Sequence, residues 1–327
     1  MNQPTPSPQP ELSTNRRLRA FLKLCIALLA ISCAPILIRF SETDLGANGT
    51  VLNRLLIFAV VFGSVQVGRS AVTPKTVADP EAPIPWHLKG LLLGVGVISV
   101  LSLVLWAMSL QHISVAKSML LNNLTPIFTT LGGWVLFKKQ VSARFLIGMA
   151  IALCGALALG LEDVQGITEN LVGDLYAVLS AVFLGLYFLM VEQLRQRFGA
   201  TTILLSRAIV GSLVLFPIAW FTEGQVFPTT ASAWLAAIGL GILCEGFGQR
   251  LLADAMDQLS SSFIALFLLL EPIISAILAW GIFAEQLSPL TWVGFGVVLT
   301  GIYISTATSS ASKTQKAAAS VAINEFI

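Results

Sequence analysis

The sequence predicts an all-α integral membrane protein with ten transmembrane helices, arranged as two inverted five-helix repeats. Three observations carry this prediction: hydropathy, the placement of charge, and an internal repeat. Of the 327 residues, 56% are hydrophobic and only 11% are charged, and the mean hydropathy is +0.84. A soluble domain carries about 25% charged residues. Apolar runs of roughly 20 residues, the length that crosses a bilayer, recur along the whole chain.

The first half of the chain contains five such runs. The first, 21–40, follows a Pro-, Gln- and Ser-rich start and a group of basic residues. It lacks a small-residue cleavage site, so we interpret it as a retained helix rather than a signal peptide. The next are expected at 47–68, 88–110, 115–137 and 143–161. A long proline-containing connection separates 47–68 from 88–110 and is expected to lie at the surface.

The second half contains five more runs, expected at 171–191, 200–221, 231–252, 259–283 and 287–307. The predicted domains are therefore a disordered cytoplasmic N-terminus over 1–20, a first five-helix repeat over 21–161, a second over 171–307, and a disordered cytoplasmic tail over 308–327. The tail is rich in Ala and Ser, and such composition does not supply a packed core.

Basic residues are distributed very unevenly between the two sides of the membrane in this arrangement. The positive-inside rule places loops rich in Lys and Arg in the cytoplasm, and both termini are then cytoplasmic. The face opposite carries acidic residues: Glu42, Asp44, Glu162, Asp163, Glu169, Glu223 and Glu285. The cytoplasmic face holds 15 of the 19 basic residues: Arg16, Arg17, Arg19, Lys23, Arg69, Lys75, Lys89, Lys138, Lys139, Arg144, Arg195, Arg197, Arg250, Lys313 and Lys316.

The internal repeat links residues 113–155 to 259–301 without gaps at an offset of 146, with 12 identities in 43 positions. Arg54 and Arg207 align at a second offset, 153. Because each half has five helices, an odd number, the second half enters the membrane inverted, an architecture that recurs in secondary transporters. Apolar composition alone does not explain the identical pairs Pro126/Pro272, Trp134/Trp280, Gln140/Gln286, Ser142/Ser288, Gly148/Gly294 and Gly155/Gly301.

Ionisable residues inside the bilayer are the candidates for a substrate pathway, because a charge at a helix centre costs about 2.5–3.5 kcal/mol on insertion scales. Glu271 lies in the middle of 259–283, directly before Pro272. A proline interrupts helical hydrogen bonding, so Pro126 and Pro272 are expected to kink two equivalent helices around a cavity. Glu271 could bind a proton or a cationic substrate, or could stabilise the kink.

Six further residues complete the predicted pathway. Asn122 and Asn123 precede Pro126, and adjacent residues differ by about 100° around a helix, so at most one is expected to point squarely into the cavity. Lys117 could line the pathway or extend to the surface. Arg54 and Arg207 could bind a substrate anion, extend to the surface, or pair with Glu271 or Glu245. Glu245 is itself a pathway candidate.

The stretch Leu270-Glu271-Pro272 through Ala284-Glu285-Gln286-Leu287-Ser288 resembles the ninth-helix pattern of the EamA-type drug/metabolite transporters. Leu124-Thr125-Pro126 through Gln140-Val141-Ser142 is similar to the family's fourth helix, and the resemblance covers residues 22 to 307. It implies ten helices without an ATP-binding module, and export or exchange of small metabolites, amino acids, nucleobases or drugs. Lys139 departs from the family pattern, which usually has an acidic residue there; we interpret this as cytoplasmic anchoring.

Together these observations predict a secondary active transporter, an exporter or exchanger of a small metabolite or drug-like solute, in the plasma (inner) membrane or an organellar envelope. Protons as coupling ion and a second copy of the chain in a homodimer are further hypotheses. A net charge of +2 gives no reason to expect nucleic acid. No cofactor, metal or enzymatic activity is expected, because the sequence has no HExxH, GxGD or Cys/His pattern. The alternatives are a non-transporting scaffold or sensor, and an intramembrane enzyme.

Overall fold

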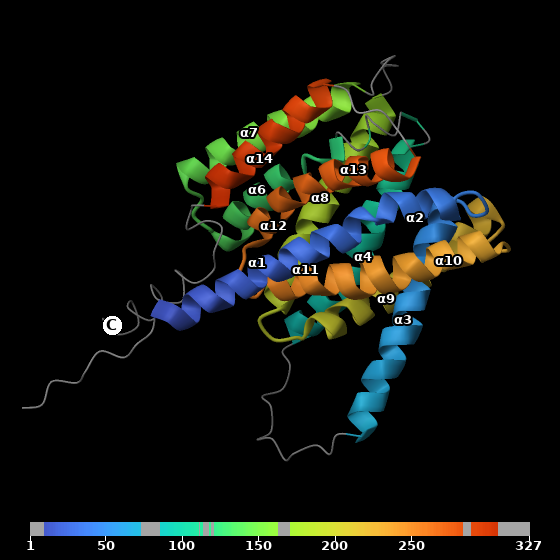
Figure 1. The fold of residues 1–327 in the computed structure, drawn as a ribbon. Coiled ribbons are helices and arrows are strands. Elements are labelled where there is room, and N and C mark those ends of the chain that lie inside the picture. Colours follow the sequence, from blue (N-terminus) through green and yellow to red (C-terminus); the bar gives the residue numbers. More distant parts are fainter. Residues whose placement is uncertain are drawn as a thin grey trace, which may run out of the picture.

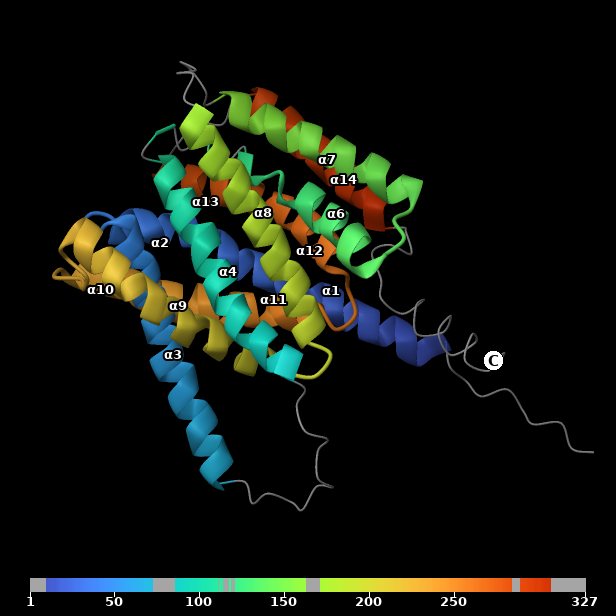
Figure 2. The same ribbon diagram turned by 180° about the vertical axis from the view of Figure 1, so that it is seen from behind.

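The computed structural model of the protein describes residues 10–72, 86–110, 112–113, 118, 121–162, 171–283 and 289–306. Every element in that part of the chain is a helix (Figures 1 and 2). By length and composition, six helical stretches can cross a membrane: Leu18–Ile38, Ala47–Gly68, Leu88–Trp106, Leu171–Leu194, Ala200–Glu223 and Ala231–Ala255. Four shorter apolar stretches accompany them: Thr125–Phe137, Ala143–Leu157, Ser261–Ser275 and Trp292–Ser305.

The first half of the chain forms α1 (Pro10–Ser32), α2 (Ala34–Ser41), α3 (Ala47–Val72), α4 (Trp86–Leu110), α6 (Thr125–Phe137) and α7 (Ala143–Glu162). The first predicted helix is thus divided at Cys33, just before Pro35, whose ring is compatible with a helix start but not with an interior. Helix α1 also begins earlier than expected. Residues 10–20, which the sequence analysis assigned to a disordered terminus, are helical from Pro10 onward.

The second half forms α8 (Leu171–Leu194), α9 (Ala200–Glu223), α10 (Ala231–Gly239), η1 (Leu240–Gln249), α11 (Arg250–Ala255), α12 (Ser261–Phe267), η2 (Leu268–Leu270), α13 (Glu271–Phe283) and α14 (Pro289–Thr306). Element η1 is a π-helix that continues α10 into α11, and η2 is a 3₁₀ turn between α12 and α13. The hydroxyls of Thr230 and Ser260 cap α10 and α12 by accepting from backbone amides three residues on.

Helices α7 and α14 lie side by side at the edge of the molecule in both views (Figures 1 and 2). Glycines bring the two backbones together. A Cβ on Gly148 would lie 2.6 Å from the Gly301 carbonyl oxygen, and one on Gly155 would lie 3.0 Å from that of Gly294. The numbering runs in opposite directions along the two contacts, so the pair is antiparallel. Small residues at such positions permit close helix packing in membranes.

The remaining helices pack in matching pairs of contacts. Helix α4 packs on α8 and α9, while the α10–η1–α11 rod packs on α1 and α3. Likewise α6 packs on α8, and α13 packs on α1. Helices α3 and α9 contact each other directly, as do α6 and α12. In the predicted order of ten helices, α4, α8 and α9 are the third, sixth and seventh, while the α10–η1–α11 rod, α1 and α3 are the eighth, first and second. Each contact of α4 therefore has a counterpart made by the rod, and the α6–α8 contact has a counterpart in the α13–α1 contact.

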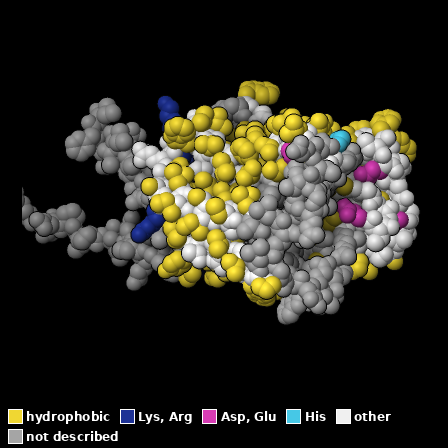
Figure 3. Space-filling model, turned by 90° about the horizontal axis from the view of Figure 1, so that it is seen from above, with side chains coloured by type: hydrophobic (Ala, Val, Ile, Leu, Met, Phe, Trp, Pro, Cys, Tyr) yellow, Lys and Arg dark blue, Asp and Glu magenta, His cyan; other side chains and the backbone are white. Residues whose placement is uncertain are grey.

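Charge separates towards two ends of the molecule, with a hydrophobic surface between them (Figure 3). We call the end with Glu42, Asp44 and Glu223 the acidic end. Its loops are joined by side chains: Glu223 accepts hydrogen bonds from the amides of Asn48 and Gly49 at 2.7 and 2.8 Å. Partial burial of the carboxylate, and then the nearby Glu223 carboxylate, raise the pKa of Glu42.

Asp44 joins the loop between α2 and α3 to the start of α10. Its carboxylate accepts hydrogen bonds from the Thr229 hydroxyl at 2.6 Å and from the amides of Thr229 and Thr230. These hydrogen bonds, the Thr229 hydroxyl first, hold the pKa of Asp44 well below its usual range.

The opposite end, called the basic end, is joined by ion pairs. Arg195 contacts Asp257 at 2.5 Å and Asp254 at 3.1 Å. Lys139, just after α6, contacts Glu192 of α8 at 2.6 Å, and Glu192 also accepts from the Ser261 amide of α12 at 3.0 Å. Glu192 is only 3% exposed. The surface-anchoring interpretation of Lys139 is therefore incomplete, since its ammonium neutralises a buried carboxylate.

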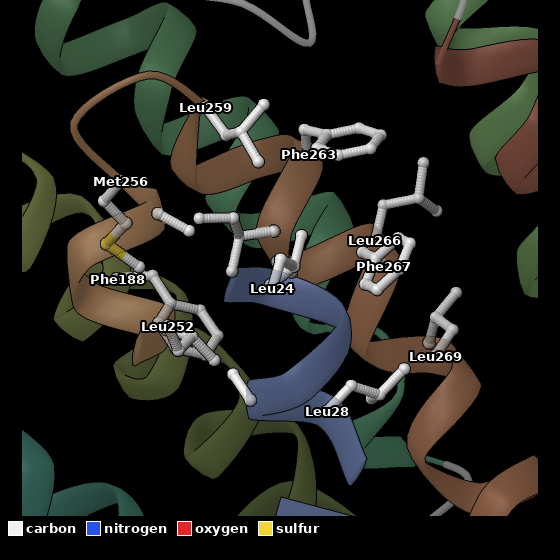
Figure 4. Close-up of a cluster of buried hydrophobic side chains, with 14 of the residues drawn as sticks. Leu24, Leu28, Phe188, Leu252, Met256, Leu259, Phe263, Leu266, Phe267 and Leu269 are labelled. Atoms are coloured by element: carbon white, nitrogen blue, oxygen red, sulfur yellow. The ribbon is translucent and has the colours of Figure 1, made fainter. Parts of the chain in front are cut away.

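A cluster of buried hydrophobic side chains lies beside the basic end (Figure 4). The members labelled in Figure 4 come from α1, α8, α11, the turn between α11 and α12, α12 and η2. These members are Leu24, Leu28, Phe188, Leu252, Met256, Leu259, Phe263, Leu266, Phe267 and Leu269.

Candidate functional site

A cavity of about 270 Å³ lies between the helices, on the acidic-end side of the hydrophobic cluster. The lining residues that α1 and α2 contribute, from Ile31 to Ile38, lie in the part of these two helices that is away from the basic end. Phe188 belongs to both the cavity wall and the cluster. The cavity and the hydrophobic cluster are therefore adjacent. Most of the wall is apolar, and the polar groups are few and concentrated.

Two interrupted helices contribute to the wall. Helix α6 starts at Thr125 with Pro126 in its first turn, after a turn at Asn123 and Leu124. Helix α13 starts at Glu271 with Pro272, after the 3₁₀ turn η2. Both helices are 13 residues long and begin 146 residues apart. The prolines thus mark helix starts, and the polar residues just before or at these starts face the cavity.

The π-helix η1 determines the position of Glu245. On α4, Gly96 approaches the Arg207 carbonyl oxygen and Val210 of α9; on η1, Gly241 approaches the Arg54 carbonyl oxygen and Ile57 of α3. Gly96 and Gly241 are 145 residues apart in the chain. A π-helix accommodates one extra residue relative to a regular helix.

Because η1 contains this extra residue, matching residues of α4 and η1 that follow it are 146 apart in the chain. Glu245 therefore corresponds to Ser99 of α4. Both residues contact an arginine Nε: Arg54 Nε donates to Glu245 at 2.8 Å, and Arg207 Nε donates to the Ser99 hydroxyl at 2.7 Å. The two halves of the site therefore match except that one carries a carboxylate and the other a hydroxyl.

Glu245 is fully buried and binds both arginines. One carboxylate oxygen accepts from Arg54 and the other accepts from Arg207. The Arg207 guanidinium also lies over the Tyr187 ring, 5.0 Å from its centroid. A carboxylate in the protein interior is strongly disfavoured unless it is paired and hydrogen-bonded, and two guanidinium groups meet that need. Of the alternatives for the arginines, pairing with Glu245 is the one present in the structure.

Arg54 and Glu271 are left with unused charge that faces the cavity. Only Nε of Arg54 donates to Glu245, and no hydrogen bond joins its two terminal nitrogens to another described residue. The Glu271 carboxylate likewise has no hydrogen-bond or ion-pair partner among the described residues, although it interacts electrostatically with Arg54. One cationic and one anionic group therefore line the same cavity without contacting each other.

Three further polar atoms in the cavity wall have no hydrogen-bond partner within the described part of the chain. They are Nε1 of Trp106, Oδ1 of Asn122 and Oε1 of Gln249. Buried polar atoms are nearly always hydrogen-bonded, so one donor and two acceptors remain for groups that enter the cavity.

The predicted pathway residues occupy the following places. Arg54, Arg207, Asn122, Asn123, Glu271 and Pro272 line the cavity, and Pro126 lies one turn beyond Asn122. Glu245 lies behind the arginines rather than in the wall. Lys117 lies outside the described residues. Both asparagines line the wall, where at most one was expected, because the helix is broken by a turn at Asn123.

Sequence reasoning missed Ser99 and Gln249 as neighbours of the site. The spacing of 146 between Ser99 and Glu245 was a signal that could have identified Ser99. Gln249, four residues after Glu245, lines the cavity although Glu245 itself does not. Within the described residues, no three His, Cys, Asp or Glu side chains gather as they would around a metal ion.

Comparison with known proteins gives a consistent result over nearly the whole chain. The sequence profile of the EamA-like transporter family matches residues 18–161 and 171–307. A protein of Archaeoglobus fulgidus named an uncharacterized transporter is 22% identical over 275 residues, which are 81% of this chain and 96% of that protein.

Two more relatives come from bacteria. The uncharacterized transporter YxxF of Bacillus subtilis is 22% identical and covers 82% of this chain and 83% of its own. The pseudopaline exporter CntI of Pseudomonas aeruginosa is 25% identical over 221 residues, 68% of this chain and 74% of that protein. A crystal structure with 18% identity superimposes with a TM-score of 0.74 over 89% of this chain and 98% of that one, which shows that the fold is shared.

Proposed function

The chain belongs to the EamA-like transporter family of multi-pass membrane proteins, and from that premise we propose that it is a secondary active transporter that moves a small solute by alternating access. The observation that carries the proposal is the cavity, which adjoins the hydrophobic cluster and is lined by charged and polar groups with unused bonding capacity. A volume of about 270 Å³ is slightly below the range of about 300–1,000 Å³ typical of drug-sized ligands, which favours a small metabolite.

We propose further that the ten helices form two inverted repeats related by a two-fold axis in the membrane plane. The Gly148–Gly301 and Gly155–Gly294 contacts support this arrangement, because exchanging the repeats at an offset of 146 turns one contact into the other. The matched contacts of Arg54 and Arg207 support it as well. The two ranges that the family profile matches, 18–161 and 171–307, are close to the proposed repeats.

In this proposal the basic end faces the cytoplasm, both termini included, and the membrane is the plasma (inner) membrane or an organellar envelope. Separation of basic from acidic side chains towards opposite ends supports that orientation (Figure 3). The described conformation would then be closed to the cytoplasm by the hydrophobic cluster and the Lys139–Glu192 contact. Transport would require both to open while the acidic-end loops close.

Export or exchange is the direction we propose, supported by the CntI relative, which is named an exporter. The unpaired Glu271 carboxylate is the group we propose for proton coupling, because it faces the cavity without a partner. A homodimer remains a hypothesis. A non-transporting scaffold or sensor would not require unpaired charges in a cavity, and an intramembrane enzyme would require a reactive constellation.

The test of transport is a comparison of metabolites inside and outside cells with and without the protein, with Arg54→Gln as a second comparison. We expect at least one small solute to shift across the membrane when the wild-type protein is present, and not with Arg54→Gln. A scaffold or sensor would leave the distribution of solutes the same in wild type and variant. Membrane abundance of both proteins is measured alongside, so that loss of protein is not mistaken for loss of transport.

A further inference from the structure

The charges around the cavity differ between two positions that the fold otherwise matches. Arg54 Nε and Arg207 Nε make equivalent contacts, one to Glu245 and the other to Ser99. A hydroxyl on both sides would leave two free guanidinium groups beside the cavity, and a carboxylate on both sides would neutralise both. The single carboxylate, shared between the two arginines, produces an intermediate state.

The sharing is unequal in a way that selects Arg54 for contact with a solute. Arg207 is occupied on three sides, by Glu245, by the Ser99 hydroxyl and by the face of Tyr187, and its side chain is 7% exposed. Arg54 contacts Glu245 through Nε alone, and its side chain is 16% exposed. Its terminal nitrogens, which form the fork that binds carboxylate or phosphate oxygens in pairs, remain available.

The other free charge is the Glu271 carboxylate at the start of α13. It has no partner in the described part of the chain, and two acceptors without donors, Asn122 Oδ1 and Gln249 Oε1, line the same cavity. A cavity that holds a carboxylate and two free amide oxygens suits a protonated amine, which carries three donors and no acceptor. With two arginines and two glutamates charged, the cavity has no net charge.

We propose that Glu245 sets the charge selectivity of the cavity, so that it accepts zwitterionic solutes: an anionic group on the terminal nitrogens of Arg54 and a protonated amine on Glu271, with an apolar body between them. The inference rests on the proposed transport function and narrows its substrate class. A solute with one charge would leave either Arg54 or Glu271 desolvated and unpaired, which is costly in a low-dielectric site.

The test uses two series of probes, each with one apolar body and three charge states. The first is leucine, 4-methylpentanoate and 3-methylbutylamine; the second is phenylalanine, 3-phenylpropanoate and 2-phenylethylamine. Binding to the purified full-length protein in detergent is measured by thermal stabilisation. We expect the zwitterion to bind at least tenfold more tightly than the acid and the amine of its series. Equal or tighter binding of an acid or an amine would overturn the inference.

Other zwitterions are covered by the same criterion. If neither series binds but the metabolite comparison identifies a transported solute, the net charge of that solute decides: a zwitterion supports the inference, and an acid, an amine or an uncharged solute contradicts it. If no solute is transported, the proposed function itself fails, which is a different result from transport with the wrong charge selectivity.

Two variants test the assignment to Glu245. Glu245→Gln frees both arginines, and we expect the ratio of acid to zwitterion binding to rise at least tenfold. Because that variant leaves two cations close together and could fail to fold, Arg54→Gln serves as the second test; Glu245 then keeps Arg207, and binding should shift towards the amine. Unchanged selectivity in either folded variant would contradict the inference. Glu42→Gln and Arg197→Gln remove the same charges at exposed positions outside the cavity and serve as matched controls.

Discussion

The Lys139–Glu192 contact at the basic end offers a prediction whose size can be worked out from the structure. Replacing Lys139 with Met removes the ammonium that contacts the Glu192 carboxylate, which is 3% exposed. Breaking a buried ion pair on one side costs about 3–5 kcal/mol. The Ser261 amide still donates to Glu192, and Lys139 is 21% exposed in the pair, so we expect a local cost of about 2–3 kcal/mol, below that range.

The cost should appear where the contact acts, at the start of α12. Hydrogen exchange of the Ser261 amide in the purified protein reports local opening. A loss of about 2–3 kcal/mol corresponds to exchange that is roughly 30- to 150-fold faster, since each 1.36 kcal/mol is a factor of ten. Lys138→Met is the matched control, because it removes the same charge from the exposed neighbouring residue.

A double-mutant cycle separates pairing from general destabilisation. In Lys139→Met with Glu192→Gln the buried charge is gone, and exchange at Ser261 should be slower than in Lys139→Met alone. If Lys139→Met and Lys138→Met exchange equally fast, or if the two changes at the pair add without interaction, Lys139 does not neutralise Glu192 and the account of this end is wrong.

Three other predictions concern separate parts of the molecule. Gly148→Leu should destabilise the protein by about 1–3 kcal/mol, because its Cβ would lie 2.6 Å from the Gly301 carbonyl oxygen. Gly90→Leu should not, because no atom lies within 4 Å of a Cβ at Gly90. Equal thermal unfolding midpoints of the two variants would contradict the close α7–α14 contact. The lowered pKa of Asp44 means that its hydrogen bonds stabilise the fold above about pH 4, the usual carboxyl pKa, and that this stability is lost as pH falls further through the lowered pKa. Asp44→Asn should therefore melt at a lower temperature than wild type at pH 7, with the difference shrinking below pH 4; a difference independent of pH would contradict the assignment. Glu271→Gln should insert normally but transport more slowly and without dependence on a pH gradient, and a rate that still follows the gradient would exclude Glu271 as the coupling group.

Much of the fold was predictable because lipid imposes a simple rule on sequence. A spanning helix needs about 20 apolar residues, so helix positions such as 47–68 and 200–221 were close to α3 and α9. The pathway residues were predictable for the related reason that charges inside a bilayer are expensive. Arg54, Arg207 and Glu271 stood out in apolar surroundings, and all three line the cavity.

What the sequence concealed was the local backbone geometry that decides which charges meet. No hydropathy pattern distinguishes a π-helix from an α-helix, so the extra residue in η1 was invisible. Pairing of the arginines with Glu245 was therefore only one of several alternatives, and nothing in the sequence selected it. The turn before Pro126 similarly brought Asn122 and Asn123 to one wall, against the regular 100° spacing. Lys139 was interpreted at the surface because its partner, Glu192, lies 53 residues away in the chain.

Solute counterflow in proteoliposomes is the measurement that tests the central claim most directly. Liposomes containing the purified protein are preloaded with the solute identified in cells, and uptake of the labelled solute is followed. Wild-type protein should produce transient accumulation, while empty liposomes and liposomes with Arg54→Gln should not. Absence of counterflow for every candidate metabolite with correctly inserted wild-type protein would contradict a transporter with its substrate site at Arg54 and Glu271.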